Sequence, residues 1–160
     1  MTRSSLPFLV LLLLTLASCA KPTGDYLFMS AQTAGERGGH YEFQLRMDDS
    51  TCRYDAFLAA RVVTSRIPGS SLSLDIRTVS PSGETAIERL QLPLGDPSAA
   101  QITLGSGSQA DYQWPWRSFN PTSAESGLWQ VSVTPTDPET AAAFYGIGLS
   151  YKGTPWAKEN

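Results

Sequence analysis

The feature that most constrains the fold is a strict alternation of apolar and polar side chains. In Tyr41–Met47, every second residue is apolar and the residues between are Glu42, Gln44 and Arg46. The same alternation is found in residues 72–77, 129–133 and 145–151, and longer apolar runs occupy 57–63 and 87–94. A period of two places successive side chains on opposite faces of a β-strand. These segments are therefore predicted to be strands with one face turned to a core.

Turn-forming residues separate the predicted strands. They occur at Pro68–Gly69, Ser80–Gly83, Gly95–Pro97, Gly105–Ser108, Asn120–Pro121 and Pro135–Pro138. Short strands joined by such turns are typical of antiparallel sheets packed on one core. The sequence therefore predicts an all-β protein, a jelly-roll-like antiparallel β-sandwich in a single domain. It allows at most one short helical turn, at Pro138–Ala143, with Asp137 as its N-cap.

The N-terminus has the features of a secretory signal peptide. Arg3 is followed by the apolar run Leu6–Leu16, which is too short to span a bilayer. The run ends in Leu16-Ala17-Ser18-Cys19, which resembles the lipobox of bacterial lipoproteins. That resemblance implies a diacylglycerol on the Cys19 sulfur, cleavage before Cys19 and acylation of the new amine with a fatty acid such as palmitate. An ordinary secretory signal followed by a chance cysteine is the alternative interpretation.

Four segments follow from this interpretation. Residues 1–18 are the signal peptide, 19–39 a lipidated N-terminus and tether, 40–153 the β-sandwich domain, and 154–160 a frayed tail. Within the tether, the apolar patch Tyr26–Met29 has one early strand as its alternative interpretation. Ala20 stands where inner-membrane lipoproteins of enterobacteria carry aspartate. By that resemblance we expect anchoring in the outer membrane, on either its periplasmic or its surface face.

The net charge bears on nucleic-acid binding, and the cysteine content bears on disulfide formation. Removing residues 1–18 takes away Arg3 and no acidic residue, so the formal net charge of −3 becomes −4. A mildly acidic chain without a basic stretch argues against nucleic-acid binding. After lipidation of Cys19, Cys52 has no intrachain partner, and we interpret it as a buried small apolar residue rather than a reactive thiol.

No set of residues with catalytic or metal-binding spacing is evident. His40 is the single histidine of the sequence. It follows Gly39, and we interpret it as a solvated loop residue. Asp48 and Asp49 match no calcium loop, and no Gly-x-Ser-x-Gly motif is present. The sequence therefore predicts no catalytic residues, no metal and no cofactor.

The most unusual local feature is Trp114-Pro115-Trp116. Exposed tryptophans provide flat surfaces for sugar rings or partner side chains. Tyr112, Trp114 and Trp116 are therefore a candidate platform for a ligand or partner. The alternative is that both tryptophans pack into the core.

Residues 54–152, about two thirds of the chain, resemble the gliding-motility GldH-type lipoprotein family. The resembling features are Phe57–Arg61, Leu72–Gly83, Ser126–Val131 and Gly146–Leu149. The resemblance implies an outer-membrane lipoprotein that works with gliding and secretion machinery without known catalysis. Only the lipid-bearing Cys19 corresponds to a functional residue of that family.

Three functions are open from the sequence. The leading hypothesis is a lipid-anchored, non-catalytic envelope protein belonging to a gliding-motility or secretion-associated assembly, with envelope proteins as partners. The second is a surface carbohydrate-binding lipoprotein that uses the exposed tryptophans, and the third is an enzyme.

Overall fold

The computed structural model of the chain describes residues 24–37, 39–94, 101–103 and 107–156. The predicted signal peptide, the lipidation site Cys19 and residues 157–160 lie outside the described residues. Within them, no helix is both long and apolar enough to cross a membrane.

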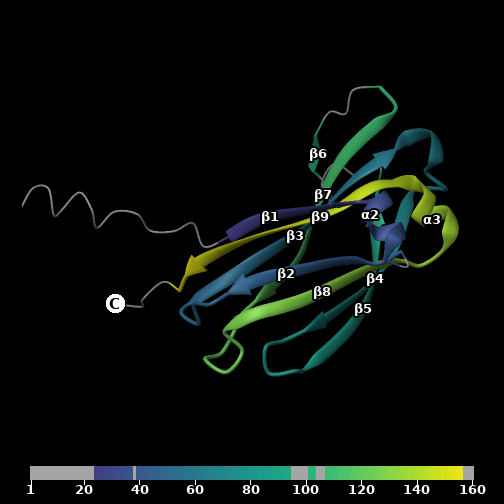
Figure 1. Cartoon of the computed structure of the whole chain (residues 1–160). Helices are drawn as coiled ribbons and strands as arrows, with labels where there is room; N and C mark the ends of the chain where they lie inside the picture. Colours follow the sequence, from purple (N-terminus) through teal and green to yellow (C-terminus); the bar gives the residue numbers. More distant parts are fainter. Residues whose placement is uncertain (1–23, 38, 95–100, 104–106, 157–160) are drawn as a thin grey trace, which may run out of the picture.

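Two antiparallel sheets form the molecule (Figure 1). The five-stranded sheet has the order β1 (Gly24–Ser30), β9 (Phe144–Pro155), β3 (Cys52–Val63), β7 (Gln109–Phe119) and β6 (Gln101–Thr103). The four-stranded sheet has the order β2 (Tyr41–Met47), β8 (Gly127–Pro135), β4 (Ser71–Val79) and β5 (Thr85–Pro93). The predicted all-β antiparallel fold is confirmed.

The strand order is that of a jelly roll. Without the three-residue strand β6, the sheets read β1-β9-β3-β7 and β2-β8-β4-β5. The chain changes sheet at every step from one strand to the next except two: β4 and β5 form a hairpin within the four-stranded sheet, and β6 and β7 pair within the five-stranded sheet. This alternation between two facing sheets is the double-sheet solution by which β proteins bury two apolar faces against each other.

The core lies between the sheets and follows the alternation in the sequence. Tyr41–Met47 alternates strictly between buried and exposed residues, and Cys52–Val63 buries every even-numbered position. The largest fully buried side chains are Tyr54, Leu45, Met47, Leu58, Leu72, Leu74, Ile76, Ile147, Leu149, Val62, Val131 and Val133. Cys52 is buried among them, as interpreted from the sequence, and burial raises the pKa of its thiol.

Helical structure exceeds the single turn that the sequence predicted. The helix α3 (Pro138–Ala143) is confirmed, and Asp137 Oδ1 accepts a hydrogen bond from Thr140 N at 2.7 Å. A second helix, α2 (Ala31–Glu36), and a 3₁₀ turn, η2 (Thr64–Arg66), were not predicted. At the start of α2, Ser30 Oγ accepts from Thr33 N at 3.2 Å, the cap that stabilises this short helix.

The predicted domain boundary at residue 40 is too late. The alternative of one early strand at Tyr26–Met29 is confirmed as β1, and α2 follows it in the segment that was otherwise predicted to be a tether. Strand β1 pairs with β9 along its whole length, from Gly24 opposite Lys152 to Ser30 opposite Gly146. Leu27 and Met29 of β1 pack against the core. An edge strand can pack against the core with only a few apolar residues. The two in this patch are therefore sufficient to hold β1 on the sheet.

The predicted frayed tail also begins too early. Strand β9 extends to Pro155, and Trp156 N–H donates to Thr51 O at 3.0 Å. Gly24 and Pro155 lie at the same end of the sandwich, the left end in Figure 1, whereas α2 and α3 lie at the other.

Candidate functional site

Two exposed aromatic side chains stand on the outer face of the five-stranded sheet. Tyr26 and Phe28 of β1 are 56% and 44% exposed. Their strand neighbours Leu27 and Met29 point to the core, so the alternation of β1 places both rings on the solvent side. The same edge strand therefore closes the core with one face and presents aromatic rings with the other.

The rings rest on a strip of β9 that has no side chains. Gly146 and Gly148 occupy the outer face of β9, and Ile147 between them is fully buried. A Cβ at Gly146 would overlap the ring of Phe28, and one at Gly148 would lie 2.9 Å from the Tyr26 hydroxyl. The glycines thus allow the aromatic rings to lie close against the sheet.

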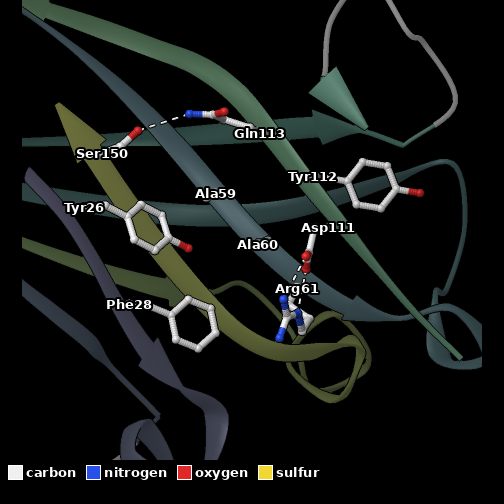
Figure 2. Close-up of a pocket in the computed structure, with 9 residues that line it drawn as sticks. All are labelled: Tyr26, Phe28, Ala59, Ala60, Arg61, Asp111, Tyr112, Gln113 and Ser150. Carbon is white, nitrogen blue, oxygen red and sulfur yellow. Dashed lines mark hydrogen bonds and ion pairs between the residues drawn. The ribbon is translucent and has the colours of Figure 1, made fainter. Parts of the chain in front are cut away.

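Polar side chains occupy the same face on the β7 side. Arg61 of β3 donates two hydrogen bonds to Asp111 of β7, from Nε to Oδ1 at 2.7 Å and from Nη2 to Oδ2 at 2.8 Å. Gln113 Nε2 donates to Ser150 Oγ at 3.1 Å. Figure 2 shows both pairs, with Tyr26 and Phe28 on the β1 side.

The charges of Arg61 and Asp111 compensate each other. The hydrogen bonds from Arg61 hold the pKa of the Asp111 carboxyl below its ordinary value, and those bonds raise the pKa of the Arg61 guanidinium. Burial, followed by the nearby charge of Asp111, raises the pKa of Tyr26. At neutral pH Arg61 and Asp111 therefore form a compensated ion pair beside a protonated Tyr26 hydroxyl.

These residues enclose a groove of about 490 Å³ across the outer face of the sheet. We call it the β1–β7 groove; it is lined by Tyr26, Phe28, Ala59, Ala60, Arg61, Asp111, Tyr112, Gln113 and Ser150. Its volume falls in the range of about 300–1,000 Å³ that is typical of small-molecule sites. The groove is therefore the candidate binding site.

The predicted platform of Tyr112, Trp114 and Trp116 is wrong as an exposed surface. Trp114 is only 3% exposed, its ring is stacked on Tyr112 with centroids 5.4 Å apart, and its Nε1 donates to Pro93 O at 2.9 Å. Trp116 is half-buried and donates from Nε1 to Glu88 Oε1 at 3.1 Å. The alternative of core packing holds for Trp114, and of the three residues only Tyr112 lines the groove.

The other polar residues singled out from the sequence have structural roles. His40 is exposed beside β2, and its Nδ1 lies 2.8 Å from Thr134 Oγ1. Asp49 Oδ1 accepts from both the N–H and the hydroxyl of Thr51, which fixes the turn before β3. Among the residues that the structure describes, no group of three or more histidine, cysteine or acidic side chains could hold a metal ion.

Comparison of the sequence with protein-family models and with curated proteins finds no match. The resemblance to GldH-type lipoproteins therefore remains a prediction.

Replacing Gly146 by alanine tests the packing beneath the groove. The new methyl group would overlap the Phe28 ring and lie 2.7 Å from Met29 O. Overpacking of this kind costs about 1–3 kcal/mol, so we expect a lower urea midpoint for unfolding of the purified protein. Gly69→Ala is the matched control, because a Cβ at Gly69 meets nothing within 4 Å. Equal midpoints for the two variants would contradict the close approach of Phe28 to β9.

Proposed function

We propose that this protein is a lipid-anchored, non-catalytic component of a cell-envelope assembly, with a gliding-motility or secretion-associated complex as the specific candidate. The proposed anchor is the acylated Cys19 in the outer membrane, and the proposed partners are other envelope proteins.

The observation that carries the proposal is the short distance between anchor and domain. Strand β1 begins at Gly24, five positions after Cys19, and every residue of β1 is paired with β9. Five residues span at most about 18 Å when fully extended. An acyl group on Cys19 would therefore hold the sandwich against the membrane surface, where a component of a membrane-bound assembly is needed.

The chemistry of the groove is consistent with binding rather than catalysis. Asp111 is the one carboxylate among the lining residues, and it is engaged twice by Arg61, with a lowered pKa. A general base works best when its pKa is near the operating pH. A carboxylate whose pKa is lowered further from neutrality is poorly suited to proton transfer.

Site-specific photo-crosslinking in intact cells tests the proposal. A photoreactive residue is placed at one exposed position at a time: Gln44 and Gln91 on the four-stranded sheet, and Lys152 near the proposed anchor. We expect the positions on one face to form crosslinks to a reproducible set of outer-membrane or secretion proteins. The positions on the other face should not form these crosslinks. If no position yields a protein adduct, the assembly proposal is wrong.

A further inference from the structure

The β1–β7 groove presents aromatic rings in fixed positions. Tyr26 and Phe28 lie on an edge strand, and their rings are set against Gly148 and Gly146 rather than free in solvent. Aromatic side chains supply a large contact area with little loss of conformational entropy on binding. The apolar side of the groove is therefore prepared for a flat ligand with an apolar face.

The polar side of the groove offers both donors and acceptors beyond its internal hydrogen bonds. Each Asp111 oxygen accepts one bond from Arg61, and the Arg61 guanidinium uses two of its five N–H groups in this pair. Among the side chains that the structure describes, nothing else engages the second lone pair of either oxygen. Gln113 uses one amide N–H toward Ser150, so its carbonyl oxygen and second N–H can bind a ligand. Adjacent donors and acceptors of this kind match neighbouring hydroxyl groups, each of which donates and accepts.

Charge selects against ionic ligands. The opposite charges of Arg61 and Asp111 are 2.7 Å apart at their closest atoms and compensate each other. An anion would meet Asp111 and a cation would meet Arg61, so neither is favoured by the pair. A neutral ligand with hydroxyl groups can use both residues without disturbing their bond.

Taken together, these properties specify one ligand class. We propose that the β1–β7 groove binds a neutral saccharide, with the apolar face of a sugar ring on Tyr26 and Phe28 and its hydroxyl groups on Asp111, Arg61 and Gln113. The site is distinct from the tryptophan platform predicted from the sequence, and it does not depend on the proposed assembly. An envelope glycan in reach of the anchored domain would be the natural ligand.

Calorimetric titration of the full-length protein in detergent micelles tests the proposal. The probes are maltohexaose, cellohexaose and chitohexaose, with hexagalacturonate as an anionic comparator. We expect at least one neutral probe to bind, and to bind at least tenfold more tightly than hexagalacturonate. Failure of all three neutral probes would overturn the saccharide site and leave the crosslinking result unaffected.

Variants locate the binding in the groove. Gln113→Ala removes two ligand-facing groups without touching the backbone ladder, and we expect it to weaken binding about tenfold, equivalent to about 1.4 kcal/mol. Gln91→Ala, an exposed glutamine on the other sheet, is the control and should leave affinity unchanged. Phe28→Ala should also weaken binding, and its thermal unfolding is measured alongside. Equal affinity in Gln113→Ala and Gln91→Ala, or unchanged affinity in a folded Phe28→Ala, would place the ligand elsewhere and overturn the proposal.

Discussion

Replacing Cys19 by serine is expected to release the protein from the membrane fraction completely. A serine hydroxyl cannot form the thioether that carries the diacylglycerol in lipobox proteins. Each CH₂ buried in the bilayer contributes about 0.8 kcal/mol, so loss of the acyl chains removes far more binding energy than a protein surface would replace. Labelling with radioactive palmitate and fractionation of cell membranes measure both the modification and its effect.

The experiment needs a form in which residues 1–18 are exchanged for a secretory signal without a lipobox, since an uncleaved signal peptide could itself hold the variant in the membrane. Cys52→Ser is the matched control, because Cys52 is buried in the core and should not affect labelling. Full membrane retention of the serine variant after a high-salt wash would show that Cys19 is not the anchor.

Replacing Trp114 by alanine is expected to destabilise the fold by about 3–5 kcal/mol, the usual cost of deleting a buried tryptophan side chain. The substitution removes the stacking partner of Tyr112 and leaves Pro93 O without the indole N–H donor. Because domains of this kind are stable by only about 5–15 kcal/mol, the loss is a large share of the total. Urea unfolding of the purified protein measures it.

Trp156→Ala is the control for Trp114→Ala. Trp156 is 50% exposed, and its hydrogen bond to Thr51 O comes from the backbone N–H, which alanine retains. We expect its free energy of unfolding to change by no more than about 0.5 kcal/mol. Equal destabilisation by the two substitutions would contradict the burial of Trp114 between the sheets.

The alternation of side chains was sufficient to predict the sandwich, because a strand with one apolar face specifies which face is buried. It was not sufficient for β1. The partner of β1 is β9, more than a hundred residues further along the chain, and the residues of β1 that pack against the core are Leu27 and Met29. Such a non-local pairing leaves little trace in the local sequence, so the segment was predicted to be mostly a tether, with one early strand only as the alternative.

The site was missed for a related reason. The fate of Trp114 and Trp116 depends on which face of β7 is inner and on the register shift between β3 and β7 at Ala56 and Phe57, and neither can be read from residue types alone. One signal for the groove was present: glycine at both 146 and 148, alternating with apolar residues, indicates a strand whose outer face is bare. The rings that cover this strip come from β1, and only the folded structure brings them together.

The place of β1 between anchor and sandwich also determines how the protein would bear a mechanical load. A pull transmitted through Cys19 would enter the domain at Gly24 and act along the axis of β1, while the rest of the sheet was held by a partner. The hydrogen bonds of an antiparallel pair run perpendicular to the strands. The ladder from Gly24–Lys152 to Ser30–Gly146 would therefore be loaded in shear, with its bonds resisting together rather than opening one after another. In this geometry β1, which the sequence placed in the predicted tether, is the strand through which tension would pass from the membrane to the folded domain.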